Sequence, residues 1–142
     1  MEKLTFLDSS FLRLESSRHP FHVGGLMILK KPPGASDNYL RRLAASAGQL
    51  NEAWPVFNKK LKDAEDLANG VWVTENNYHP ERHVLHYALP GPGKMQDLLA
   101  LVSRAHERQL DRNRPLWEMH IIDGLQGDRF AVYCKVHHAL VD

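Results

Sequence analysis

The stretch WEMHIIDGLQGDRFAVYCKVHH, residues 117–138, decides the fold of this chain. Its apolar segments 117–123 and 129–138 have the length and composition that are typical of strands. Between them, residues 124–128 read GLQGD, a glycine-flanked connection that suits a β-hairpin. The sequence therefore predicts two neighbouring strands joined by a short turn.

Amphipathic helices are predicted upstream of this hairpin. Segment 5–16, TFLDSSFLRLES, carries apolar residues at helical spacing after Thr5, whose hydroxyl suits an N-cap. Segment 36–50 opens with polar capping residues and carries one apolar stripe. Segment 95–110 repeats apolar residues at intervals of three and four. Each stripe predicts a helix that packs through one face.

Three further strands are predicted before the hairpin. They are expected at 26–29, 70–75 and 82–89, and the first and last are followed by proline and glycine clusters that indicate loops. Segment 54–62 shows only a weak pattern. Because helices are interspersed with strands along the chain, we expect an α/β domain in which helices cover a sheet.

The length, net charge and cysteine content of the chain limit the classes of protein to which it can belong. Its 142 residues suit one domain, and a formal net charge of +1 without a long run of one sign gives no support for nucleic-acid binding. The single cysteine, Cys134, can form no disulfide within the chain and excludes a cysteine-based zinc site. No apolar stretch is long enough to span a bilayer, and the first residues lack the layout of a secretion signal. We therefore expect a cytoplasmic domain.

Two adjacent histidines, His137 and His138, close the second strand of the hairpin. Side chains alternate between the faces of a strand, so His138 is expected to end an apolar stripe and to point toward the buried or cleft side, with His137 opposite. An imidazole with a reference pKa of about 6.5 can accept a proton near neutral pH. Asp142 follows four residues after His138, where a carboxylate could hold the turn that orients the ring.

Structural interpretations compete with a catalytic one. A histidine pair at a strand end is also a common polar cap, and an aspartate in a turn is also a common Asx-turn residue, so the pattern alone leaves both open. His79, His83 and His86 have a spacing that on a helix could bind zinc. Pro80 and the apolar residues that follow favour an extended segment instead, so we expect no metal site.

Five stretches, all in order along the chain, resemble one enzyme family. HHALVD at 137–142 fits the His-His-x-x-x-Asp signature, normally followed by glycine, of the CoA-dependent acyltransferase superfamily, which includes chloramphenicol acetyltransferase and peptide-synthetase condensation domains. Together with four other stretches it resembles the bacterial wax ester synthase and acyl-CoA:diacylglycerol acyltransferase family. These four are FLDSSFLRLES (6–16), HPFHVGGLMIL (19–29), RHVLHYALPGPG (82–93) and NRPLWEMHIIDGL (113–125).

The resemblance covers essentially the whole chain and implies the first half of a two-domain acyltransferase with the layered α/β fold of chloramphenicol acetyltransferase. Residues 1–142 would form the N-terminal acyltransferase domain and end within the HHxxxDG motif, with the C-terminal domain absent from this chain. The chain also stops on a strand without a closing element, which favours the same expectation. In such enzymes the active-site tunnel runs between the two halves.

The resemblance also implies a reaction. A fatty acyl group would pass from acyl-CoA, bound as a substrate rather than as a permanent cofactor, to a long-chain alcohol or diacylglycerol. His138 would be the general base, and His137 and Asp142 would shape the loop, Asp142 through a salt bridge to an arginine. No acyl-enzyme is needed, so Cys134 is expected to be a core residue. Contact with a membrane or lipid-droplet surface is expected for such substrates.

The PLW element of the resemblance comprises Pro115, Leu116 and Trp117. We expect it to fix the start of the strand beside the histidine strand, with contact to the acyl substrate as the alternative. Two other functions stay open at this point. One is a condensation-type acyltransferase that uses an amine acceptor, and the other is a non-catalytic lipid-binding half-domain.

Overall fold

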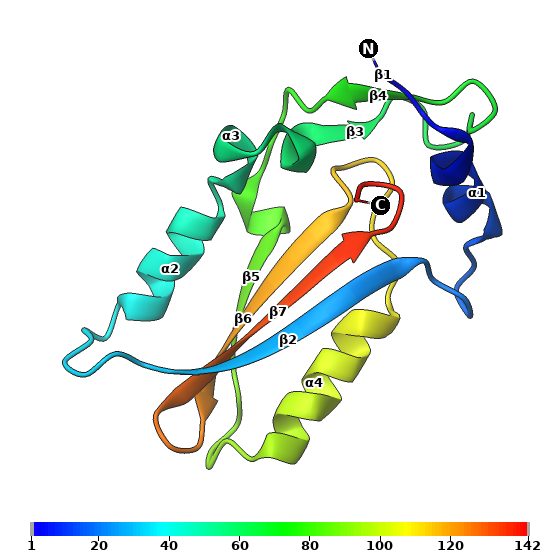
Figure 1. Cartoon of the computed structure of the whole chain (residues 1–142). Helices are drawn as coiled ribbons and strands as arrows, with labels where there is room; N and C mark the ends of the chain where they lie inside the picture. Colours follow the sequence, from blue (N-terminus) through cyan, green and yellow to red (C-terminus); the bar gives the residue numbers. More distant parts are fainter. Residues whose placement is uncertain (1, 142) are drawn as a thin grey trace.

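The computed structural model describes residues 2–141, which form two β-sheets with helices packed against them (Figure 1). The larger sheet has the strand order β2-β7-β6-β5, and the smaller sheet has the order β1-β4-β3. The elements in chain order are β1 (Glu2–Lys3), α1 (Phe6–Leu14), β2 (His22–Lys30), α2 (Tyr39–Ala47), α3 (Leu50–Ala53), the 3-10 turn η1 (Pro55–Asn58), β3 (Lys59–Leu61), β4 (Val71–Thr74), the 3-10 turn η2 (Pro80–Arg82), β5 (Val84–Ala88), α4 (Met95–Glu107), β6 (Trp117–Leu125) and β7 (Arg129–His137).

The predicted hairpin forms the centre of the larger sheet. β6 and β7 pair antiparallel, with an irregular register only at the end near the turn. In that turn Gly124 and Gly127 have φ angles of 87° and 82°, a left-handed backbone that glycine adopts without a Cβ clash. The hairpin prediction is therefore confirmed.

Helices cover both faces of this sheet. β5 runs parallel to β6, and the crossover that parallel neighbours need includes α4, which lies across one face (Figure 1). On that face Leu98 of α4 packs with Ile122. On the opposite face Leu40 of α2 packs with Ile121. Because adjacent side chains of a strand point in opposite directions, the central strands are buried on both sides, as in the layered α/β fold that the sequence predicts.

β2 is longer than predicted. The sequence indicates a strand only at 26–29, but β2 spans His22–Lys30 and pairs antiparallel with β7 along its whole length. Its first pair joins His22 to His137. The diglycine at 24–25 interrupts the apolar pattern but not the backbone hydrogen bonding, so a reading of side chains alone begins the strand too late.

The helices agree with the predictions at two of three places. α1 has the expected cap, since Asp8 N–H donates to Thr5 Oγ1 at 3.0 Å and Thr5 N–H donates to Asp8 Oδ2 at 3.1 Å. α4 also lies where it is predicted.

The single helix expected at 36–50 is two helices, because the backbone turns at Gly48 between α2 and α3. None of the described helices is long and apolar enough to cross a bilayer.

A third apolar cluster joins α1, the smaller sheet and the end of β7. The segment 54–62, whose pattern is weak, contains η1 and β3 and contributes to this cluster. The cluster brings the C-terminal end of β7 against the N-terminal helix. Its buried members are Leu12, Leu61, Trp72, Leu110, Leu116, Trp117, Ala139 and Leu140.

Candidate active site

The two adjacent histidines lie where β7 ends and the chain turns. His137 is the last residue of β7, and its backbone N–H donates to Leu116 O at 3.0 Å. His138 follows in the turn, where its N–H donates to Phe21 O at 2.9 Å, just before β2. The turn closes when Leu140 N–H donates to His137 O at 3.0 Å. Strands on both sides thus fix the backbone of the histidine pair.

The His137 ring is almost fully enclosed, with 1% of its side chain exposed. Its Nδ1 accepts the Ala139 N–H at 3.0 Å, and its Nε2 lies 3.1 Å from Glu15 Oε2. Because Nδ1 accepts a hydrogen, the neutral ring carries its proton on Nε2 and donates it to Glu15. Both ring nitrogens are therefore engaged.

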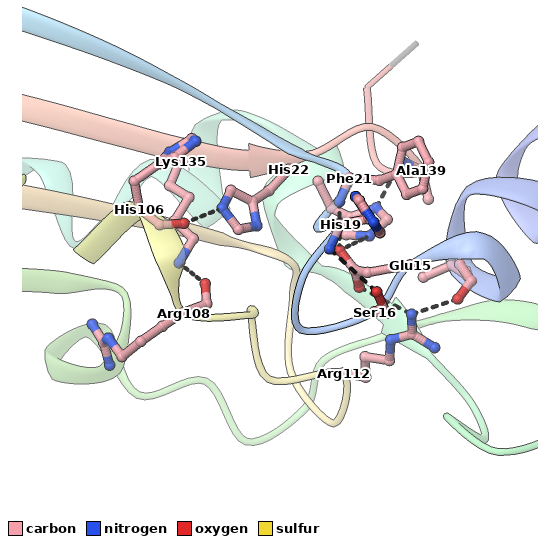
Figure 2. A network of polar contacts seen from close by, with 12 residues as sticks. Glu15, Ser16, His19, Phe21, His22, His106, Arg108, Arg112, Lys135 and Ala139 are labelled. Carbon is pink, nitrogen blue, oxygen red and sulfur yellow. Dashed lines mark hydrogen bonds and ion pairs between the residues drawn. The ribbon is translucent and has the colours of Figure 1, made fainter. Parts of the chain in front are cut away.

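Glu15, directly after α1, is the acceptor at the centre of a buried polar network (Figure 2). Its side chain is 1% exposed and also accepts the Phe21 N–H at 2.8 Å and Arg112 Nη2 at 3.0 Å. Burial raises the pKa of Glu15, but the hydrogen bonds from His137, the Phe21 N–H and Arg112 outweigh burial and lower that pKa to about 2. The carboxylate is therefore ionised at neutral pH.

The His138 ring has different surroundings. It is half-buried and stacks on Phe11 of α1, with the ring centroids 5.1 Å apart and the planes at 26°. Among residues 2–141 no group forms a hydrogen bond to its ring nitrogens. The expectation that His138 points to the enclosed side and His137 away from it differs from the structure, which buries His137 more deeply because both faces of β7 are covered.

Asp142, the third residue of the predicted motif, lies outside the described residues. Its expected part in shaping the turn stays a prediction. Arg112 is the described arginine that is linked to His137 through Glu15. Its Nη2 donates to Glu15 Oε1 at 3.0 Å and to the Leu12 carbonyl at 2.5 Å.

The PLW element lies in the core beside the histidine strand. Leu116 and Trp117 are buried, and Trp117 Nε1 donates to Phe57 O at 2.9 Å. His83 stacks on Trp117 at a centroid distance of 4.7 Å, and its Nδ1 lies 2.8 Å from Trp117 O. Burial lowers the pKa of His83 despite this hydrogen bond. These contacts are packing contacts, and substrate contact by Pro115, Leu116 or Trp117 stays a prediction.

His83 therefore has a packing role in the core. It is sandwiched between the rings of Tyr78 and Trp117, whereas His79 and His86 are exposed. No group of three or more histidine, cysteine, aspartate or glutamate side chains within residues 2–141 is arranged to hold a metal ion.

A second polar network, which the sequence analysis missed, lies on the α4 face of the sheet (Figure 2). Lys135 of β7 is fully buried and donates to the carbonyls of Ala105, at 2.8 Å, and Arg108 at the end of α4. Burial lowers the pKa of Lys135. Beside it the Tyr133 hydroxyl contacts His106 Nδ1. A lysine in a strand with two covered faces was the available signal, since such a residue needs buried partners.

Glu15 and Arg112 were also missed, and the sequence offers little to find them. Glu15 lies 122 positions from His137 and 97 positions from Arg112. No local spacing rule connects residues at such separations. Cys134, in contrast, lies half-buried on the apolar side of β7 as expected, and burial raises the pKa of its thiol.

Solved structures share this fold. The structure is similar to the first condensation domain of the calcium-dependent antibiotic synthetase, with a TM-score of 0.70 at 12% identity, over 96% of this chain and 32% of that chain. The likeness shows a fold of the condensation-domain type, in accord with the superfamily that the histidine motif suggests.

The sequence places the chain more narrowly. The family model for the wax ester synthase/diacylglycerol acyltransferase catalytic domain matches residues 4–142, and the chain belongs to this family. A putative diacylglycerol O-acyltransferase of Mycobacterium bovis is 43% identical over 136 residues, 95% of this chain and 30% of the relative. The wax ester synthase/diacylglycerol acyltransferase from Marinobacter aquaeolei VT8 matches with a TM-score of 0.87 and 43% identity, over 99% of this chain and 35% of that chain. The chain thus spans about a third of the length of these proteins.

Proposed function

We propose that this chain supplies the histidine-bearing part of an O-acyltransferase that moves a fatty acyl group from acyl-CoA to a long-chain alcohol or to diacylglycerol. Membership of the family and the names of its relatives support this chemistry. The observation that carries the proposal is the contrast between the two histidines. His137 has both ring nitrogens engaged, whereas the ring nitrogens of His138 accept or donate no hydrogen bond among residues 2–141.

In the proposed reaction His138 acts as the general base. A neutral imidazole accepts the hydroxyl proton while the alcohol oxygen attacks the thioester carbonyl. The new carbon–oxygen bond forms, the carbon–sulfur bond breaks, and the proton passes from His138 to the departing CoA thiolate. His137 cannot replace it, because its unprotonated nitrogen holds the Ala139 N–H and its other nitrogen already carries a proton.

The remaining parts of the site are proposed to come from a second domain of the same enzyme. The relatives are about three times as long as this chain, which supports a partner domain that completes the acyl-transfer tunnel. No permanent cofactor is proposed, since acyl-CoA enters and leaves as a substrate. Phe6 and Leu14 of α1 are 89% and 68% exposed, which supports contact of this helix with the lipid phase that holds the substrates.

The test uses the full-length enzyme with palmitoyl-CoA as donor and hexadecanol or dioleoylglycerol as acceptor. The His138→Ala variant should lose about 10²- to 10⁴-fold in kcat, the usual contribution of a general base. His86→Ala, which removes an exposed histidine of β5, is the control and should keep wild-type activity. Undiminished esterification by a folded His138→Ala enzyme would reject the assignment.

Hexadecylamine in place of hexadecanol tests the choice of acceptor. Ester formation with little amide formation supports an O-acyltransferase. Preferential amide formation would instead favour a condensation-type activity. An enzyme that binds palmitoyl-CoA and forms neither product would favour a non-catalytic lipid-binding role.

A further inference from the structure

The Glu15 carboxylate is enclosed, and both of its oxygens accept hydrogen bonds. Its side chain is 1% exposed, although it lies at the end of an amphipathic helix where the neighbouring Leu14 is in solvent. Oε2 receives hydrogen bonds from His137 and from the Phe21 N–H, and Oε1 receives one from Arg112. Such burial of a charge is costly unless each partner is in place.

The first connection from this carboxylate runs through the His137 ring. Glu15 accepts the hydrogen on Nε2, which leaves Nδ1 free to accept the Ala139 N–H at 3.0 Å. Ala139 is the residue after His138. The ring of His137 is thus a rigid bridge between Glu15 and the backbone on the C-terminal side of His138.

The second connection runs through Phe21. The N–H of Phe21 donates to Glu15 at 2.8 Å, and the carbonyl of Phe21 accepts the His138 N–H at 2.9 Å. The Phe21 ring also packs on Phe11 at a centroid distance of 5.7 Å, and Phe11 in turn stacks on the His138 ring. The backbone on the N-terminal side of His138 is thereby fixed to the same carboxylate.

We propose that Glu15 is the positioning residue of the two-histidine turn. Through its hydrogen bonds, Glu15 sets the tautomer of His137 and places the His138 ring for proton transfer. This inference rests on the proposed function of His138. Glu15 contacts no reacting atom in this scheme. It acts through His137 and Phe21, and Arg112 keeps its carboxylate in place.

The neutral isostere shows why the charge and both acceptor atoms matter. In Glu15→Gln one carboxylate oxygen becomes an NH₂ group, which is a donor and cannot accept from its present partner. If that group faces His137 Nε2, the ring must move its proton to Nδ1. A proton on Nδ1 would point at the Ala139 N–H. Because both groups are then hydrogen-bond donors, they would repel each other and the turn would have to shift.

The experiment measures steady-state kinetics and the histidine tautomer in the full-length enzyme. We expect Glu15→Gln to lower kcat by about 10- to 100-fold, the usual effect of losing a group that orients a functional residue, with KM for palmitoyl-CoA nearly unchanged. Glu15→Asp keeps the charge on a shorter side chain and should recover part of the loss. Glu107→Gln removes an exposed carboxylate of α4 and should match the wild type.

The tautomer is read from ¹⁵N chemical shifts of labelled histidine, with His137 assigned by the spectrum of His137→Asn. Wild-type enzyme should show His137 protonated on Nε2, and Glu15→Gln should lose that signal pattern. This measurement on the wild type keeps the inference testable even where a variant fails to fold, because a wild-type His137 protonated on Nδ1 would overturn it.

The outcomes separate the inference from the function on which it rests. If His138→Ala abolishes esterification while Glu15→Gln keeps the wild-type kcat and tautomer, only the positioning role fails. If His138→Ala leaves esterification intact, the proposed base fails first. A Glu15→Gln enzyme that is folded, slow and altered in the His137 tautomer supports the inference.

Discussion

The ring of Tyr133 on β7 crosses the neighbouring strand at Gly24. A Cβ atom at Gly24 would lie 2.6 Å from Tyr133 Cε1 and closer still to the hydroxyl oxygen, whereas a Cβ at Gly25 would meet nothing within 4 Å. The crossing lets the Tyr133 hydroxyl contact His106 of α4. One residue of the diglycine is therefore required for packing against the sheet, and the other is not.

The adjacent glycines provide a matched pair of substitutions. Gly24→Ala should lower the free energy of unfolding by about 1–3 kcal/mol, because the added methyl group must displace the Tyr133 ring. Gly25→Ala should be neutral or stabilising by up to about 1 kcal/mol. Urea unfolding of both variants measures the difference, and equal effects at the two positions would contradict the packing argument.

The buried carboxylate of Glu15 predicts that the stability of the folded protein decreases at acidic pH. The pKa of Glu15 lies at about 2 in the folded protein, against an ordinary value of 4.5 for a glutamate carboxyl group. A lowered carboxyl pKa stabilises the folded state above the unfolded value and loses this contribution as the pH falls toward the folded value. At about 1.4 kcal/mol per pKa unit the contribution is at most about 3.5 kcal/mol.

Comparison with Glu15→Gln isolates this contribution. The difference in unfolding free energy between wild type and variant should be constant from pH 7 to about pH 5 and should shrink between about pH 4.5 and pH 2. Urea titrations at a series of pH values give the curve. A difference that does not change with pH would show that Glu15 has an ordinary carboxyl pKa.

Lys135 should contribute to stability through the end of α4. Lys135→Met keeps the length of the side chain but leaves the carbonyls of Ala105 and Arg108 without this donor, for an expected loss of about 1–3 kcal/mol. Lys31→Met is the control, since its ion pair with Asp123 is partly exposed and should contribute less than about 1 kcal/mol. Thermal or urea unfolding tests both, and a Lys135→Met protein as stable as the wild type would contradict the expectation.

Cys134 should be dispensable for acyl transfer. Burial raises the pKa of its thiol, so at neutral pH it stays protonated and is a poor nucleophile. Cys134→Ala is expected to keep the wild-type kcat, and mass spectrometry during turnover should detect no acyl group on the protein. An acylated Cys134 would reveal a covalent intermediate and contradict direct attack by the alcohol.

The fold was predictable where one segment contains its own signal. The Thr5 cap, the apolar stripe of α4 and the glycine turn between β6 and β7 each depend on residues within one short stretch, and all three predictions are confirmed. β2 and β3 were predicted too short or not at all. Their place depends on the strands with which they pair, and pairing partners are not visible in local periodicity.

The candidate site shows the same division. The two histidines are visible as a motif, but the more deeply buried one is His137, because both faces of β7 are covered and sequence alternation cannot show this. Glu15 and Arg112 reach the site only through the tertiary fold. The residues that hold a functional group were therefore harder to predict than the group itself.

The contact between Glu15 and His137 joins residues 122 positions apart, and this separation has a consequence for biosynthesis. Contacts of high sequence separation form slowly, because the intervening loop must close before any contact compensates its entropy. During translation α1 and β2 emerge before β7, and β2 has no pairing strand until β7 has left the ribosome. Assembly of the two-histidine turn is thus expected to be a late event, and the newly made N-terminal segment depends on other protection from aggregation until then.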